Sequence, residues 1–237
     1  MNVYYKNKIA SLKGDDPIPG TYLENVYDSS LELPVMFGKD NVAITGNYGL
    51  GAAVVDSFCL GYTNAYRYSL TVYDGTDELG AFSGFTTDRI TINNFYEPFI
   101  IDNFKLVLEG AESLYLGHLF LGLKTILPRF EVQPDIGEKL FSQSSRSFGG
   151  QVFGLRRNTL RNFSVNFPRI TSEERDVFIE YIKSVLNIEP HIIDPYYEAH
   201  DKFPPMYATL DIDDNKTPKL NEHGFYYSTS LGWQEAR

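Results

Sequence analysis

The stretch FKLVLEGAESLYLGHLFL, residues 104–121, decides the fold that the sequence predicts. In residues 104–108, large apolar side chains recur at every second position, and the polar Lys105 lies between two of them. This period of two is typical of a strand with one face buried and the other face, here marked by Lys105, in solvent. Residues 114–121 are apolar almost throughout, so we expect a central strand that is buried on both faces and bent at Gly117.

Working outward, short apolar runs alternate with turn residues over most of the first half of the chain. Glycine, proline, asparagine and aspartate separate the runs, as turns require, and the 17 Tyr and 17 Phe suit half-buried strands. Seven strands at this spacing predict an antiparallel β-sandwich of the jelly-roll kind. The expected strands are Val42–Thr45, Ala53–Leu60, Tyr68–Tyr73, Arg89–Ile92, Phe99–Ile101, Phe104–Leu108 and Ser113–Leu121.

The sequence divides into three parts. Residues 1–33 are polar and punctuated by proline and glycine, which predicts an N-terminal arm or leading loop. Residues 34–130 form the predicted β-sandwich domain. After Pro128 the composition becomes polar and rich in small residues, so we place the boundary near 131 and expect an α+β domain over 131–237.

The expected α+β domain has one helix packed on a sheet. Thr171 and Glu174 form a capping box, and apolar side chains then recur at helical spacing before Pro190. Residues 133–137 and 142–145 are interpreted as a connection, and 156–158 as a turn. The apolar helix positions are Val177, Phe178, Tyr181, Ile182, Val185 and Leu186, and the expected strands are Gln151–Leu155, Thr159–Phe167, Met206–Leu210 and Phe225–Leu231.

Composition and charge exclude several classes of protein. With 43% hydrophobic and 22% charged residues the chain has globular composition, and no apolar stretch reaches the roughly 20 residues of a membrane-spanning helix. Its first residues lack the apolar core of a secretory signal, so we expect folding in the cytoplasm of the producing cell. The net charge of −10 disfavours nucleic-acid binding, and the single Cys59 is interpreted as a small buried hydrophobe.

No catalytic or cofactor motif is present in the sequence. The four histidines do not stand at metal-ligand spacing, His118 is interpreted as a structural residue, and Gly46–Gly51 lacks the pattern of a nucleotide-binding loop. We therefore expect no cofactor, no metal and no enzymatic activity. A glycosidase needs two opposed carboxylates, and a chain with 31 acidic residues contains such pairs by chance, so the sequence neither supports nor excludes that activity. Asp211, Asp213, Asn215 and Glu222 partly match a calcium loop, but Lys216 replaces its glycine, so an acidic hairpin loop is the preferred interpretation.

Two segments resemble the galactose-binding-like β-sandwich found in virion proteins of tailed bacteriophages. They are VDSFCLGYTNA at 55–65, followed by a strand ending at Tyr73-Asp74-Gly75, and LYLGHLFLG at 114–122. The later part resembles the continuation in those proteins, with its serine-rich segment at 144–151, the helix after Thr171, and Trp233-Gln234-Glu235 at the end of a final aromatic strand.

The resemblance implies a structural virion protein of the tail or baseplate region, assembled in the host cytoplasm and acting through contacts with other virion proteins and with further copies of itself. In related sandwiches that bind sugars, loops at one end of the sheets do so. The corresponding loop here would be 62–67, where Tyr62, Asn64, Tyr66 and Arg67 offer stacking faces and polar groups. The alternative function is a carbohydrate-binding adhesin module that contacts host surface glycans.

Overall fold

A computed structural model describes residues 1–27, 34–49, 51–87, 89–110, 113–131, 135–146, 152–185, 190–196, 204–211, 221–224 and 226–236. The chain divides into two compact units. Residues 2–126 and 191–207 make up the sandwich unit, and residues 127–190 and 208–236 make up the helix unit. In the described ranges no helix combines the length and apolar character needed to cross a membrane.

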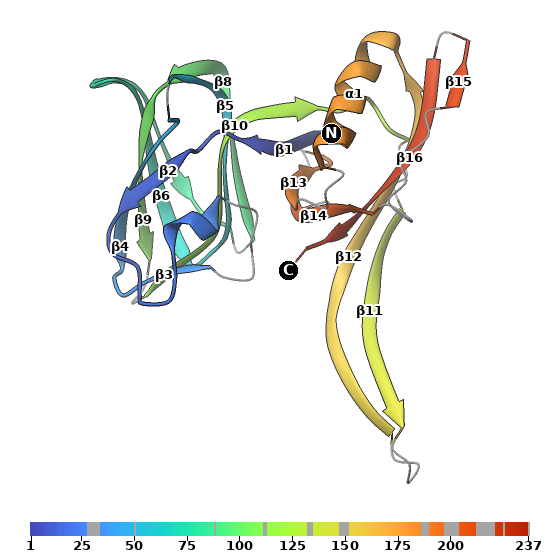
Figure 1. The fold of residues 1–237 in the computed structure, drawn as a ribbon, viewed down its shortest axis with the longest axis horizontal. Helices are drawn as coiled ribbons and strands as arrows, with labels where there is room; N and C mark the ends of the chain where they lie inside the picture. The colour runs from blue at the N-terminus through green and yellow to red at the C-terminus, as the bar shows by residue number, and fades with distance from the viewer. Residues whose placement is uncertain are drawn as a thin grey trace. The chain divides into compact units, whose positions relative to one another are not determined.

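Two antiparallel sheets face each other in the sandwich unit (Figure 1). The first sheet has the order β13-β1-β10-β5-β8, with β3 also paired to β10, and the second has the order β2-β4-β9-β6-β7. The bounds are β1 (Asn2–Asn7), β2 (Ser11–Gly14), β3 (Val35–Phe37), β4 (Asn41–Asn47), β5 (Ala53–Thr63), β6 (Ala65–Asp74), β7 (Asp77–Phe85), β8 (Ile90–Ile101), β9 (Asn103–Gly110), β10 (Leu114–Ile126) and β13 (His191–Asp194), with a short 3-10 helix at Leu23–Val26. The predicted mainly-β sandwich is therefore confirmed.

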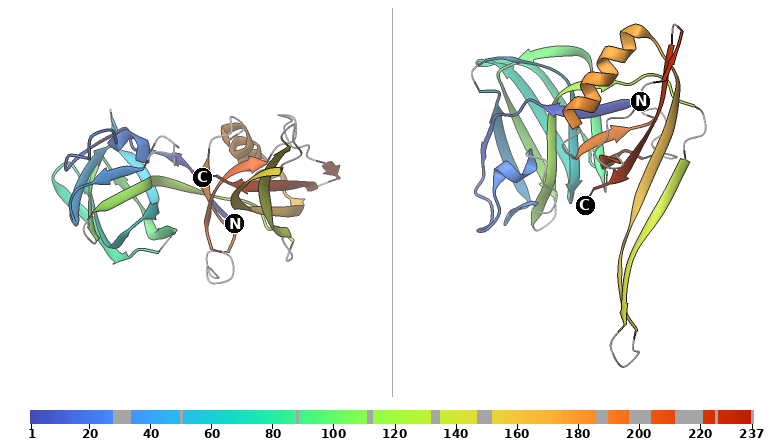
Figure 2. Two further views of the ribbon diagram at one scale, coloured as in Figure 1. Left: turned by 90° about the horizontal axis from the view of Figure 1, so that it is seen from below. Right: turned by 45° about the vertical axis from the view of Figure 1, so that its right-hand side comes forward.

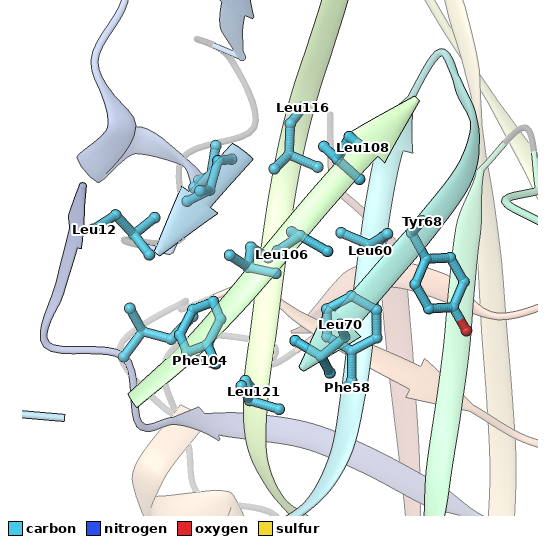
Figure 3. Close-up of a cluster of buried hydrophobic side chains, with 14 of the residues drawn as sticks. Leu12, Phe58, Leu60, Tyr68, Leu70, Phe104, Leu106, Leu108, Leu116 and Leu121 are labelled. Carbon is cyan, nitrogen blue, oxygen red and sulfur yellow. The ribbon is translucent and has the colours of Figure 1, made fainter. Parts of the chain in front are cut away.

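Alternation along the strands creates the core between the sheets. Phe104, Leu106 and Leu108 of β9 are buried, whereas Lys105 is exposed, as the period of two requires. Figure 3 shows these side chains packed with Leu70 of β6 and Leu60 of β5. The residues that decide the fold therefore face the partner sheet, and burial of their apolar surface is the main stabilising contribution.

β10 is buried on both faces, as the sequence predicts. Leu116 and Leu119 both belong to the core between the sheets. The side chains that face this core are therefore at even-numbered positions before Gly117 and at odd-numbered positions after it. On the opposite face the ring of Phe120 meets the ring of Tyr4 edge to face at 5.7 Å. Strand β1 thus supplies the cover that the second face of β10 needs.

The predicted N-terminal arm at residues 1–33 is wrong. Residues 2–7 form β1, which pairs with both β10 and β13, and residues 11–14 form β2 at the edge of the second sheet. Val3 and Tyr4 are buried because they cover a sheet face that is assembled from distant parts of the chain. Residues 28–33 lie outside the described ranges.

Two strand predictions in the middle of the sandwich also differ from the structure. Strand β7 was not predicted, because its glycines and exposed positions dilute the apolar pattern. Residues 89–92 and 99–101, predicted as separate strands, belong to the single strand β8. The predicted separator Glu97-Pro98 lies inside β8, where the pairing with β5 slips.

The helix unit has a sheet in the order β11-β12-β16-β14, with β15 also paired to β16, and one helix. Its bounds are β11 (Asp135–Arg146), β12 (Val152–Ile170), α1 (Ser172–Val185), β14 (Met206–Asp211), β15 (Asn221–His223) and β16 (Tyr226–Glu235); Met206 and Tyr207 of β14 belong to the sandwich unit. Figure 2 shows the helix against the strands of this unit. The expected helix packed on a sheet is confirmed, but residues 191–207 of the range 131–237 predicted for this domain belong to the sandwich unit.

The start of α1 and its packing follow the sequence closely. The Glu174 carboxylate accepts from the Thr171 amide at 2.9 Å, and the Thr171 hydroxyl accepts from the Glu174 amide at 3.2 Å, which is the predicted capping box. Trp233 Nε1 of β16 donates to the Tyr181 hydroxyl at 2.8 Å inside the core. Val177 of the predicted apolar face is exposed, and Leu186 lies outside the described ranges.

The predicted connection after residue 131 and the predicted turn at 156–158 are wrong. Residues 135–146 and 152–170 are the long antiparallel strands β11 and β12. In the described chain, residues 152–161 of β12 pair only with β11, because β16 pairs with β12 from Asn162 onward. A two-stranded segment has no third strand and no opposing sheet to impose alternation, so its sequence lacks the usual strand pattern.

Candidate functional site

The four predicted site residues lie at a tight corner between the two sheets of the sandwich unit. β5 ends at Thr63 and β6 begins at Ala65, so Asn64 alone connects them. The Thr63 hydroxyl accepts from the Ala65 amide at 3.1 Å and donates to the Tyr115 carbonyl at 2.7 Å. The predicted loop over 62–67 is therefore wrong, because hydrogen bonds to β10 allow the chain to change sheets within one residue.

The side chain of Asn64 closes this corner onto the start of β10. Its Nδ2 donates to the Ser113 carbonyl at 2.7 Å, and its Oδ1 accepts from the Tyr115 amide at 2.8 Å. Both ends of the amide are thus engaged with backbone groups. The structure therefore gives Asn64 a role in positioning the corner.

Tyr62 holds an unusual backbone conformation next to the corner. Its φ is 53°, the one positive value at a non-glycine position in the described ranges, and its amide donates to the Arg89 carbonyl at 2.6 Å. Left-handed backbone is costly for a bulky residue and persists where the surrounding structure requires it. A Cβ at Gly117 would lie only 3.0 Å from Tyr62 Cβ, so this conformation depends on a glycine in β10.

The exposed part of the site lies on the first residues of β6 and the last residue of β7. Tyr66 is 55% exposed at a register shift of β6, and Phe85 is 78% exposed. Arg67 pairs with Phe85 on one side and with Glu109 of β9 on the other. Arg67 and Phe85 are therefore cross-strand neighbours, and the exposed Tyr66 precedes Arg67 on β6. Aromatic rings and a guanidinium are groups suited to a polar ligand that has apolar faces.

Phe85 is the residue that the sequence did not single out. It ends β7, a strand without a clear apolar pattern, and only the cross-strand register places it beside Arg67. The one sequence signal for Phe85 is that a large apolar side chain follows small and polar residues. This signal points to an exposed aromatic residue only once the segment is known to be a strand at the surface. Thr86, the next residue, donates through its amide to the Tyr66 carbonyl and through its hydroxyl to the Ala65 carbonyl.

His118 lies behind the corner and pairs in register with Gly61. Burial lowers the pKa of His118 to about 4, and no hydrogen-bond partner for its Nδ1 occurs in the described part of the chain. Its ring lies 4.8 Å from the ring of Tyr207. A neutral, enclosed imidazole packed on an aromatic ring fills space in the sandwich, in agreement with the structural role expected from the sequence.

The single cysteine of the chain, Cys59, is buried in the sandwich unit. Burial raises the pKa of the Cys59 thiol well above its usual value, and the nearby Asp194 and Asp56 raise it further. No group of three or more His, Cys, Asp or Glu able to hold a metal ion occurs among the described residues. Of the partial calcium match, Asp213 and Asn215 lie outside those ranges, as does the side chain of Glu222.

No family model matches this chain, and no curated protein matches it. Solved structures similar to about half of it include a Ruminococcus gnavus GH29 fucosidase mutant in complex with fucose (14% identity, TM-score 0.43, 48% of this chain), of which this chain spans only 25%. Another is the family 32 carbohydrate-binding module of Clostridium perfringens NanJ in complex with galactose, with 10% identity and a TM-score of 0.43 over 53% of this chain and 100% of the module. A third is a chitosan-binding module from Paenibacillus sp. IK-5, with 17% identity and a TM-score of 0.39 over 50% of this chain and 97% of the module. None of these names indicates a phage origin.

Replacing Gly117 with alanine should destabilise the sandwich unit. The added methyl group meets Tyr62, whose backbone has no low-energy alternative at this corner, so we expect a loss of roughly 1–3 kcal/mol in the free energy of unfolding. Urea unfolding followed by circular dichroism measures it. Gly38→Ala is the matched control, because no atom lies within 4 Å of a Cβ there. Equal stability of the two variants would contradict this account of Tyr62.

The stability of the sandwich unit should also depend on pH through His118. An unfolded chain protonates histidine near pH 6.5, whereas folded His118 stays neutral down to about pH 4. The unfolded state therefore binds more protons between these values, so stability is complete above pH 6.5 and falls on acidification, by roughly 3 kcal/mol at the limit.

The measurement compares urea unfolding of the wild type with that of His118→Gln from pH 7 to pH 4. Carboxylates titrate in both proteins and cancel in the difference. We expect the stability advantage of the wild type to shrink as the pH falls. A difference that stays constant over this range would show that His118 does not titrate as described.

Proposed function

We propose that the sandwich unit binds a carbohydrate at the corner formed by Tyr66, Arg67 and Phe85. The observation that carries this proposal is the exposure of two aromatic side chains, Tyr66 and Phe85, in the described part of the sandwich unit. Aromatic faces pack against the C–H faces of a pyranose ring, and a guanidinium supplies several donors for its hydroxyl oxygens. What distinguishes Phe85 from an isolated exposed aromatic residue is the guanidinium of its cross-strand neighbour Arg67.

The corner is also pre-organised for binding. Asn64 and Thr63 attach it to β10, and Thr86 attaches the end of β7 to the start of β6. Because these bonds are present before a ligand arrives, binding orders little besides the exposed side chains themselves. This arrangement suits a module of modest size that recognises one or two sugar rings, and it requires no catalytic group.

Alanine replacement of Phe85 or Tyr66 should weaken glycan retention about tenfold or more, which corresponds to about 1.4 kcal/mol or more of lost contact. A glycan array identifies the ligand, and titration calorimetry of the purified protein measures the affinity. Tyr96→Ala is the matched control, because Tyr96 is a fully exposed aromatic residue on β8, in the other sheet. An unchanged array profile for Phe85→Ala and Tyr66→Ala would reject this site.

A second proposal is that the chain is a structural virion protein of a tailed phage, located in the tail or baseplate region. The observation that favours it is the long two-stranded segment of β11 and β12, which leaves strand edges unpaired within its own unit. Unpaired edges of this length suit insertion into an assembly of protein subunits. Both proposals give the chain a binding role and no catalytic one, and they apply to different units.

Uptake of the purified chain by phage particles that lack it tests the second proposal. We expect the protein to co-sediment with such particles and to restore their infectivity. Removal of residues 2–14 is not a suitable variant, since these residues form β1 and β2 of the sandwich unit. Failure of the intact protein to co-sediment would reject the virion role and leave glycan binding unaffected.

A further inference from the structure

The two-stranded part of β11 and β12 is the least supported element of the described chain. Glu138–Arg146 pairs with Val152–Arg161, and β16 joins β12 only from Asn162 onward. This ribbon, residues 138–146 and 152–161, extends away from the other strands of its unit in Figure 1 and in the right-hand view of Figure 2. Both of its outer edges therefore present backbone groups that no strand of this unit pairs.

A ribbon of this length is not stable by itself. Two strands in water are marginal, because they bury too little apolar surface to offset the conformational entropy that they lose. Free edges also attract other chains, and proteins usually shorten, twist or cover them. A long two-stranded ribbon is therefore expected where a partner surface completes it.

The charges of the ribbon indicate what this partner is. The ribbon carries one acidic residue, Glu138, and the five basic residues Lys139, Arg146, Arg156, Arg157 and Arg161, in a chain whose net charge is −10. Arg161 Nη2 lies 3.1 Å from the Glu235 carboxylate of β16. By contrast, residues 2–126 and 191–207 of the sandwich unit carry 18 acidic and nine basic residues.

Outside the ribbon the helix unit is acidic too, with 12 acidic and six basic residues in 127–137, 162–190 and 208–236. We infer that the ribbon of one copy docks against an acidic surface of a second copy of this chain. Opposite net charges steer the two surfaces together, while two ribbons would repel each other and two sandwich units would do the same. Since the two surfaces differ, the contact is heterologous and repeats from copy to copy, either closing into a ring or extending into a filament. The inference rests on the assembly role proposed above and is independent of glycan binding.

The test is the mass of the full chain in solution, measured by light scattering at several salt and protein concentrations. At about 0.01 M salt, where charges interact over about 30 Å, we expect a multiple of 27.0 kDa. At about 1 M salt the screening length falls to about 3 Å, and the mass should fall toward that of one chain. Arg156→Glu combined with Arg157→Glu should give 27.0 kDa even at low salt.

Lys13→Glu combined with Lys105→Glu is the matched control. It reverses two charges on exposed positions of the second sheet of the sandwich unit, and it should leave the oligomer intact. Circular dichroism and the fluorescence of Trp233, the single tryptophan, verify the fold of each variant. A wild type that stays at 27.0 kDa at low salt, or a ribbon variant with the mass of the wild type, would overturn the inference. A monomer that is nevertheless taken up by particles would overturn self-association and leave the virion role in place.

Discussion

The sandwich unit depends on the need of β10 to be covered on both faces. One face packs on the second sheet through residues such as Leu116, while the other carries Phe120 and His118. Exposing a side chain of the size of phenylalanine would cost about 1.5–3 kcal/mol, so this second face needs a cover of its own. Tyr4 of β1 covers Phe120, and Tyr207 covers His118. Segments from distant parts of the chain thereby belong to the same unit as β10, and a central strand determines where they lie.

The corner with the candidate site follows from the same strand. β10 accepts and donates the hydrogen bonds that hold Thr63 and Asn64, and its Gly117 leaves room for the left-handed Tyr62. The buried strand therefore determines the place of a site whose exposed residues belong to β6 and β7. This division of labour is typical of binding sites, in which a rigid scaffold positions the contacting side chains and does not itself touch the ligand.

Charge is distributed unevenly along the chain, and this has physical consequences. An acidic sandwich unit keeps separate molecules apart and soluble, whereas a basic ribbon provides one attractive element. Attraction between unlike regions of identical chains favours contacts of the ribbon with an acidic surface over contacts between two ribbons. Glycan binding at the corner and association through the ribbon use different units, so one molecule could combine both.

The sequence by itself determined the elements whose pattern is local. The alternation at 104–108 and the capping box of Thr171 and Glu174 both depend on near neighbours, and both were predicted correctly. Tertiary structure alone decided that residues 2–7 are a buried strand, that 135–146 is a strand, and that Phe85 lies beside Arg67. Each of these features depends on which distant strand lies alongside. Strand pairing acts through backbone hydrogen bonds that carry little trace of side-chain identity, and a one-residue corner and a loop are built from the same residue types.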